Sequence, residues 1–227
     1  ETAVSGRLSA GLQGLAGVVM RDFERGRQRY FSAEQLARIQ QQTVGIAGAG
    51  GLGSNVAMLL VRSGFCHFIL ADFDVVSVSN LNRQNYFFDQ LGKTKAVALA
   101  ENLRRIQPAL DIKIFAERLV RTDWQEVFQP ADLLVEALDD AELKAAFVED
   151  FAERGRFLVS ASGLAGCGRS DRIRTRKLSR DFVVVGDEMS GIELAPPLAP
   201  AVMLAAAKEA DAVLEYVLKG AMPHGTY

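Results

Sequence analysis

The chain has 227 residues, of which 49% are hydrophobic and 24% are charged, and its formal net charge is −2. This composition suits a globular domain with an ample core, and the slightly acidic balance argues against a general nucleic-acid binder. Its two cysteines, Cys66 and Cys167, provide neither a disulfide framework nor a CxxC zinc pair. The composition therefore predicts a protein of the reducing cytoplasm that binds no nucleic acid.

Membrane insertion and export are not expected from the apolar runs. None of them reaches the ~18 residues of a membrane span. Residues 10–20 are apolar and glycine-rich, but neither a basic segment nor an initiator Met precedes them, so we expect no signal peptide. Because the chain starts at Glu1, we expect that it can be a fragment of something longer.

In chain order, residues 1–42 form an N-terminal segment with a helical stretch at 33–41, and strands and helices alternate from residue 43 to 227. This alternation predicts a Rossmann-like, doubly wound α/β fold with a mainly parallel sheet. The expected strands are 43–48, 67–72, 111–116, 131–137 and 156–161, and the expected helices are 53–63, 94–106, 141–154 and 201–219. Residues 172–176 and 182–185 predict two further strands that extend the sheet in antiparallel fashion.

The stretch VGIAGAGGLG (44–53) reads as a strand, a glycine turn and the start of a helix. Gly48 permits the tight turn, Gly50 and Gly51 leave no side chain between backbone and ligand, and Gly53 lets the helix pack on the strand. The helix N-terminus then offers free N–H donors to an anion. The turn predicts a phosphate-binding site, although a tight turn without a ligand would need similar glycines.

The second strand ends in Ala71-Asp72-Phe73-Asp74. Asp72 follows Gly53 at close to the ~20-residue spacing expected for an acid that binds a ribose hydroxyl. An acid at this place indicates a nucleotide but does not say which one.

Polar and basic residues follow at once, in SVSNLNRQ (77–84) and GKTK (92–95). Hydride transfer to NAD places no new charge on phosphate, whereas attack of a carboxylate on the α-phosphorus of ATP does. Fixed cations such as Arg83 and Lys95 would lower that barrier, typically by ~3–4 kcal/mol for one well-placed donor. Lys93 is equally consistent with a solvated lysine.

The fourth strand ends at Asp139 and Asp140. Ligands lie outside the carboxyl ends of strands in open α/β sheets, so Asp139 is expected beside the ligand of the glycine turn, as a direct or water-mediated Mg²⁺ ligand. Asp140 fits better as the N-cap of the following helix.

In this order and spacing, GAGGLGSN, ADFDVVSVSNLNRQ, GKTKA and EALDD resemble the ThiF/MoeB/HesA superfamily of ubiquitin-activating-type adenylyltransferases. The resemblance implies that residues 43–227 bind ATP and Mg²⁺ and adenylate the C-terminal glycine of a small ubiquitin-like carrier protein. By motif position, Asp72 and Asp74 would bind the nucleotide, and Asn80, Arg83 and Gln84 would surround its phosphates. Lys95 would match the family's lysine, and Asp139 its metal-side aspartate.

Departures from the family pattern refine these expectations. No pair of CxxC motifs is present, so we expect no zinc, and residues 182–200 lack the cysteine used for thioester or persulfide chemistry. The protein would then stop at the acyl adenylate. The chain looks most like the compact thiamine-pathway branch that acts on ThiS. The resemblance also implies a homodimer in which an N-terminal arginine, with Arg25 as candidate, completes the partner's ATP site.

A basic stretch at 169–180 either protects a sheet edge from aggregation or guides an acidic carrier tail toward ATP. Three other functions stay open: an NAD-dependent oxidoreductase, an inactive scaffold with the same fold, and an adenylyltransferase of the molybdopterin or tRNA-modification pathway. The motif SNLNRQ and the absence of an obvious hydride-site histidine argue against the first, and intact Arg83, Lys95 and Asp139 against the second.

Overall fold

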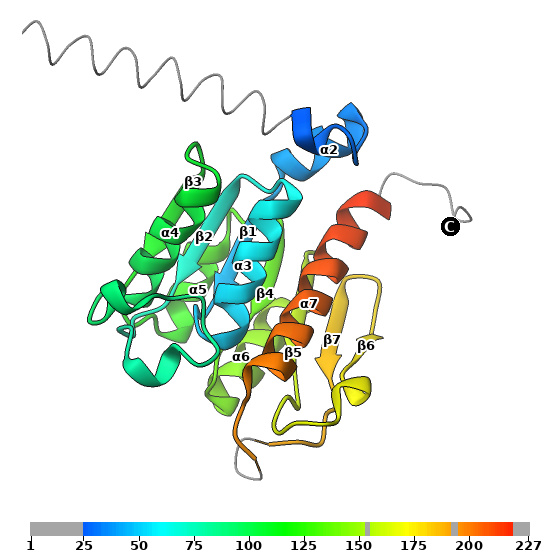
Figure 1. Ribbon diagram of the computed structural model, residues 1–227. Helices are drawn as coiled ribbons and strands as arrows, with labels where there is room; N and C mark the ends of the chain where they lie inside the picture. The colour runs from blue at the N-terminus through cyan, green and yellow to red at the C-terminus, as the bar shows by residue number, and fades with distance from the viewer. Residues whose placement is uncertain (1–24, 153–154, 192–194, 220–227) are drawn as a thin grey trace, which may run out of the picture. The chain divides into compact units, whose positions relative to one another are not determined.

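The computed structural model describes residues 25–152, 155–191 and 195–219 (Figure 1). The chain divides into two compact units, Glu1–Arg38 and Ile39–Tyr227. The division falls inside helix α2 (Ala33–Gln41), a few residues before the boundary expected at 42/43. Every feature of the candidate site described below, except Arg25, belongs to the second unit.

The described part of the second unit is built on a seven-stranded sheet in the order β3-β2-β1-β4-β5-β7-β6. The strands are β1 (Thr43–Ala47), β2 (His67–Ala71), β3 (Asp111–Phe115), β4 (Leu133–Glu136), β5 (Phe157–Ala161), β6 (Arg174–Lys177) and β7 (Phe182–Gly186). The five predicted parallel strands are confirmed. β4 and β5 are buried along their whole length, as expected for the largely apolar sequences LLVE and FLVSA when helices cover both faces of the sheet.

Helices α3 (Gly51–Ser63), α4 (Lys95–Ile106) and α7 (Ala199–Lys219) cover one face of the sheet, where α3 packs between the other two (Figure 1). Helices α5 (Arg121–Phe128) and α6 (Ala141–Phe151) cover the other face. Three short 3-10 turns, η1 (Val78–Asn80), η2 (Phe88–Gln90) and η3 (Ser170–Arg172), lie in the connections. Among the described residues, no helix combines the length and apolarity needed to cross a bilayer.

Helix α5 was not predicted, although its apolar residues follow helical spacing. Trp124, Val127 and Phe128 are buried and pack with Phe147 and Phe151 of α6. Trp124 and Phe128 each meet the Phe147 ring edge-on at 5.4 Å. The helix has only eight residues, too few for the 3.6-residue period to stand out by itself, and packing on α6 and the sheet stabilises it.

The C-terminal strands form an antiparallel pair, as predicted, but β7 itself runs parallel to β5. A tight turn joins β6 to β7, with the Leu178 and Ser179 amides both donating to the Phe182 carbonyl. The tight turn requires β6 and β7 to pair in antiparallel fashion but leaves the direction of β7 relative to β5 open. Among the seven strands, β6 therefore runs opposite to the other six. The predicted start of β6 at residue 172 was wrong because residues 170–172 form η3 instead.

Candidate functional site

The glycine turn joins β1 to α3, which begins at Gly51 rather than at the predicted residue 53. Gly48 has φ +93°, and a Cβ there would lie 2.5 Å from the Ala137 carbonyl oxygen. A Cβ at Gly53 would lie 1.9 Å from the Gly48 carbonyl oxygen. These two glycines are therefore required by the close approach of the turn to α3 and to the end of β4.

Gly50 differs from the other glycines of the turn, because packing against the protein leaves space for a side chain there. A Cβ at Gly50 would meet only the Gln84 amide, at 3.9 Å, and φ is an ordinary −77°. At Gly51 the neighbours are Val202 at 3.0 Å and the Arg83 side chain at 3.7 Å. The bare backbone at Gly50, at the N-cap of α3, leaves room for an anion at the helix N-terminus.

Asp72 ties the glycine turn to the end of β2. Its Oδ2 accepts the Ala49 amide at 2.7 Å, and its Oδ1 accepts the Asp74 amide at 2.8 Å. Burial raises the pKa of the Asp72 carboxyl, while these two amides and nearby Lys95 act in the opposite direction. Each carboxylate oxygen keeps one lone pair for a further donor, such as a ribose hydroxyl.

Lys95 and Asp74 form an ion pair beside Asp72. The Lys95 ammonium lies 2.7 Å from Asp74 Oδ2, and the Lys95 backbone amide donates to the Asp74 carbonyl. Lys95 is buried because it starts α4 and points inward, whereas Lys93 is exposed and pairs with Glu101. Of the two lysines in GKTK, only Lys95 reaches the site.

The turn after β4 supplies two aspartates with separate roles. Asp140 caps α6 as predicted, accepting the Glu142 and Leu143 amides at 2.9 Å. Asp139 is exposed, and its carboxylate has no hydrogen-bond or ion-pair partner among the described residues. Its carboxylate is therefore available to a ligand.

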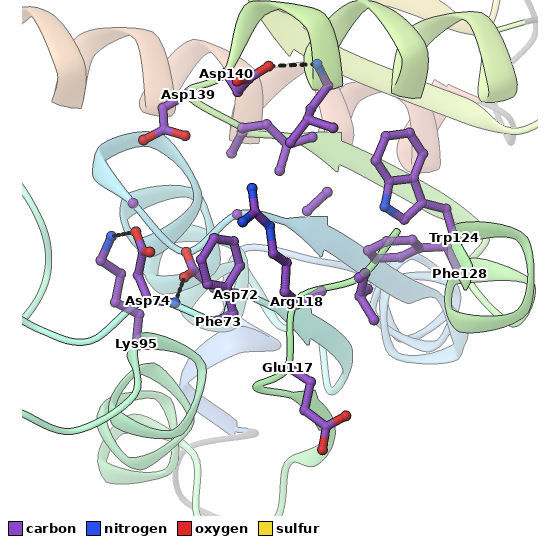
Figure 2. A pocket seen from close by; sticks show the side chains of 18 residues that line it. Asp72, Phe73, Asp74, Lys95, Glu117, Arg118, Trp124, Phe128, Asp139 and Asp140 are labelled. Carbon is purple, nitrogen blue, oxygen red and sulfur yellow. Dashed lines mark hydrogen bonds and ion pairs between the residues drawn. The ribbon is translucent and has the colours of Figure 1, made fainter. Parts of the chain in front are cut away.

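These groups surround a cavity of about 290 Å³ at the carboxyl ends of β1, β2 and β4, where the strand order reverses (Figure 2). Figure 2 shows Asp139 on the α6 side and the Lys95–Asp74 pair on the α4 side. Of the sequence-predicted residues, the cavity brings together Gly48, Gly50, Asp72, Asp74, Lys95 and Asp139. Such a reversal point is where open α/β sheets bind their ligands.

Gly51 and Gly53 of α3 lie outside this lining, as do the predicted polar residues Asn80, Arg83 and Gln84. Asn80 caps the η1 turn by accepting the Ser77 amide at 2.9 Å. Gln84 is buried beside Gly50, and its side-chain oxygen has no partner among the described residues. The Arg83 guanidinium donates to the Ser79 carbonyl at 3.2 Å and to Asn82 Oδ1 at 2.9 Å, without a carboxylate partner in the described chain. Its charge is thus available beside Gly51.

Helix α3 holds this segment in place through Asn55. The Asn55 amide nitrogen donates to the carbonyls of Gly51 and Arg83, and its oxygen accepts from Asn85 at 2.6 Å. Tyr86 adds a hydrogen bond from its hydroxyl to the Ala49 carbonyl at 2.6 Å. The position of Arg83 relative to the glycine turn is therefore set by buried polar contacts.

Sequence reasoning missed the apolar wall of the cavity. Arg118, after β3, places its guanidinium 5.2 Å from the Phe73 ring centroid, and Phe73 is 47% exposed (Figure 2). Trp124 and Phe128 of α5 also line the cavity. The one signal available in the sequence was Phe73, an aromatic residue directly after Asp72. Arg118 lies in the loop after β3, and Trp124 and Phe128 lie in α5, which was not predicted.

Three other predicted features are not among the residues that line the cavity. Arg25 belongs to the N-terminal unit, so its role stays a prediction. On the exposed strand β6, Arg176 pairs with Glu188 and Lys177 with Glu215. Both cysteines are free thiols, with Cys167 exposed.

No group of three or more His, Cys, Asp or Glu side chains in the described residues is arranged to hold a metal ion. Magnesium does not require one, because it usually binds one or two carboxylates together with substrate phosphates and water. Asp139, which has an unpartnered carboxylate at the cavity, fits this donor set.

We next compared the chain with known protein families and proteins. The model of the ThiF family matches residues 24–223. A tRNA threonylcarbamoyladenosine dehydratase from Haemophilus influenzae is 29% identical over 145 residues, which cover 63% of this chain and 55% of the relative. Ubiquitin-like modifier-activating enzyme 5 from Drosophila ananassae is 31% identical over 131 residues, or 52% of this chain and 33% of the relative. The chain thus matches between a third and about half of the length of these relatives.

Solved structures agree on the fold. The E. coli tRNA N6-threonylcarbamoyladenosine dehydratase TcdA, in complex with ATP, superposes with a TM-score of 0.81 at 20% identity, covering 90% of this chain and 97% of that one. E. coli MccB with ATP gives a TM-score of 0.66 at 23% identity, covering 84% of this chain and 60% of that one.

Proposed function

Because the chain belongs to the ThiF family, we propose that it is an ATP-dependent adenylyltransferase that activates a carboxylate as an acyl adenylate. The observation that carries this proposal is the cavity at the reversal point of the sheet. It combines an open glycine turn after β1, a buried lysine at the start of α4 and an unpartnered carboxylate after β4. TcdA and MccB, which share the fold, are both described with ATP.

In this site the adenine base lies against the Phe73 ring and Arg118, and Asp72 accepts hydrogen bonds from the ribose. The phosphates extend toward Gly50 and the N-terminus of α3, where Arg83 supplies a positive charge. Magnesium, held by Asp139 and the phosphates, would add charge neutralisation there.

The reaction joins a carboxylate oxygen to the α-phosphorus of ATP and breaks the bond to the bridging oxygen, so pyrophosphate leaves with both electrons of that bond. Two anions must approach each other, and the leaving group gains charge. The buried Lys95 ammonium, oriented by Asp74, and the Arg83 guanidinium stabilise this charge from fixed positions. The residues of this site therefore bind and orient ATP and neutralise its developing charge. No covalent bond between the protein and the substrate is needed for this step.

For the carboxylate, we favour the C-terminal glycine of a small ubiquitin-like carrier protein with a Gly-Gly tail. One relative is named as a ubiquitin-like modifier-activating enzyme, which supports this class of partner. Two others are named as tRNA threonylcarbamoyladenosine dehydratases, so a tRNA-modification substrate is the second candidate. A ThiS-like carrier and a role in thiamine biosynthesis remain predictions, as do the homodimer, the contribution of Arg25 and the cytoplasmic location.

The NAD-dependent alternative is weaker. An ion-paired lysine and an unpartnered aspartate at the phosphate end of the cavity have no part in hydride transfer, whereas both serve phosphoryl chemistry. Asp72 would accept hydrogen bonds from the ribose of either ATP or NAD, so binding measurements must distinguish the two nucleotides. We expect the protein to bind ATP, and we expect its activity not to depend on NAD.

The decisive experiment is carrier-dependent exchange between ATP and pyrophosphate, measured with purified carriers that end in Gly-Gly and with threonylcarbamoyl-modified tRNA in parallel. Exchange stimulated by a carrier supports the proposal, and its loss in Asp139→Asn assigns it to this site. Activity with the modified tRNA alone would move the assignment to the second candidate. Tight NAD binding with no ATP binding, by calorimetry, would overturn both.

A further inference from the structure

A buried tyrosine hydroxyl contacts the glycine turn. Tyr86 lies in the connection between η1 and η2 and is only 5% exposed. Its hydroxyl donates to the Ala49 carbonyl at 2.6 Å, and the Lys95 carbonyl lies 3.2 Å from the same oxygen. Burial raises the pKa of Tyr86, and Asp72 and Asp74 raise it further, so the hydroxyl keeps its proton at neutral pH. One buried donor therefore connects the glycine turn to the start of α4.

The backbone of the turn is almost fully hydrogen-bonded at this point. The Ala49 amide donates to Asp72 Oδ2 at 2.7 Å, and the Ala49 carbonyl accepts only the Tyr86 hydroxyl among the described residues. The next carbonyl, of Gly50, accepts the Ser54 amide at 3.1 Å and the Ser54 hydroxyl at 2.6 Å. The Gly50 amide has no hydrogen-bond partner in the described chain, so it is left for a ligand.

The Tyr86 hydroxyl controls the direction of this free amide. The Ala49 carbonyl and the Gly50 amide belong to one peptide group, which is planar and trans, so they point in opposite directions. A bond that fixes the carbonyl therefore fixes the amide as well. Gly50 lines the cavity, whereas Ala49 is buried and is not among the lining residues. The Gly50 N–H is thus turned away from Tyr86 on the residue that faces the ligand.

The segment that carries Tyr86 is itself held through Asn85. The Asn85 backbone amide donates to the Ser54 hydroxyl at 3.1 Å, and its side chain donates to Asn55 Oδ1 at 2.6 Å. Its carbonyl accepts the Asn102 side-chain amide at 2.8 Å. These bonds connect the segment to both α3 and α4, so Tyr86 reaches the turn from a fixed position.

We propose that Tyr86 is a positioning residue for phosphate binding, whose hydroxyl orients the Gly50 amide to donate to the phosphates of ATP. This inference rests on the proposed nucleotide site. The role differs from those of Arg83 and Lys95, because Tyr86 supplies no charge and needs no contact with the nucleotide. Loss of the hydroxyl would leave the buried Ala49 carbonyl without a partner and allow the peptide group to turn.

The test compares ATP with adenosine, which has no phosphates, in Tyr86→Phe. This variant keeps the ring and removes only the hydroxyl. In NMR titrations at neutral pH, the affinity for ATP with Mg²⁺ should fall by roughly tenfold, the scale of one hydrogen bond to a charged group. The affinity for adenosine should stay at the wild-type value. Tyr216→Phe is the matched control, because it removes a hydroxyl that donates to Asp181, and it should bind both ligands like the wild type.

Equal losses for ATP and adenosine would assign Tyr86 a purely structural role and overturn the proposal, as would an unchanged affinity for ATP. The Gly50 amide resonance gives a second measurement in isotopically labelled protein. Saturating ATP should shift it in the wild type and clearly less in Tyr86→Phe, and equal shifts would also overturn the proposal. Should the variant not fold, the wild type decides, because a Gly50 amide that ATP leaves unshifted contradicts the assigned role.

Failure of the proposed function would look different. If the wild type binds ATP but supports no exchange with any carrier or with the modified tRNA, adenylation is wrong. The comparison of ATP with adenosine in Tyr86→Phe then still decides the role of Tyr86.

Discussion

The ammonium nitrogen of Lys95 lies 2.7 Å from Oδ2 of Asp74, and the lysine is buried while the aspartate side chain is nearly half exposed. The pair therefore presents its acidic member to solvent and holds its cation inside the cavity wall. A buried cation with one exposed partner can turn toward an incoming phosphate without losing all of its neutralisation.

Lys95→Ala should lower carrier-dependent ATP–pyrophosphate exchange by roughly 10²-fold, because a fixed positive charge at the phosphates is removed. Lys93→Ala is the matched control, since Lys93 pairs with Glu101 at the surface and should lose little activity. Equal exchange rates in the two variants would remove Lys95 from the catalytic site.

Arg83→Ala should also lower exchange by about 10²-fold or more, while the protein unfolds at nearly the wild-type temperature. Among the described residues its guanidinium donates only to the Ser79 carbonyl and to Asn82, so little stability depends on it. Arg104→Ala, at an exposed position on α4, controls for loss of a surface charge. An unchanged exchange rate in Arg83→Ala would show that the phosphates lie elsewhere.

Substitutions at two glycines of the turn should have different effects, one on stability and the other on ATP binding. Gly53→Ala should destabilise the fold by about 1–3 kcal/mol or more, because its Cβ would lie 1.9 Å from the Gly48 carbonyl oxygen. Gly50→Ala should lose less stability than Gly53→Ala, because its Cβ would meet only the Gln84 amide at 3.9 Å, and should bind ATP more weakly, because the new methyl group occupies open space beside the helix N-terminus. Thermal unfolding and ATP calorimetry measure the two effects. Undiminished ATP binding by Gly50→Ala would place the phosphates away from this turn.

Phe73→Ala should weaken ATP binding by about 1–3 kcal/mol, the usual scale for a base stacked on an aromatic ring. Phe88→Ala removes an exposed phenylalanine from η2 and should leave ATP affinity unchanged. ATP titrations of both variants decide whether the base lies against Phe73. If Phe88→Ala loses as much affinity as Phe73→Ala, the assignment of the base is wrong.

Glu209 of α7 is fully buried, its carboxylate has no hydrogen-bond partner among the described residues, and it gives the fold a specific pH dependence. Its pKa of about 8 in the folded state lies above the ordinary 4.5, so the unfolded chain releases this proton first. Between these values the folded state binds one more proton, and stability from this group is lost as pH rises, by about 1.4 kcal/mol per pH unit. Glu209→Gln should remove that slope and be more stable at pH 8. Denaturant unfolding at several pH values, compared between the two proteins, would contradict this if the curves ran parallel.

Much of the candidate site was predictable because its residues follow directly from strand ends. Gly48, Gly50, Asp72 and Asp139 each lie within a few residues of a parallel strand that its apolar sequence identifies. The carboxyl ends of such strands meet at one edge, which brings these side chains together without further information. The sequence already favoured Lys95 over Lys93 and the family motif agreed with it, and the structure supports this choice through the burial of Lys95.

The sequence by itself determined the alternation of strands and helices, the phosphate-type turn and the acids after two strands, because these depend on local periodicity and on glycine's freedom of conformation. Only the tertiary structure decided that β7 runs parallel to β5 and that Arg118 meets Phe73. These relationships join segments from about 20 to more than 40 residues apart, and they depend on how the crossovers and helices pack rather than on any local pattern.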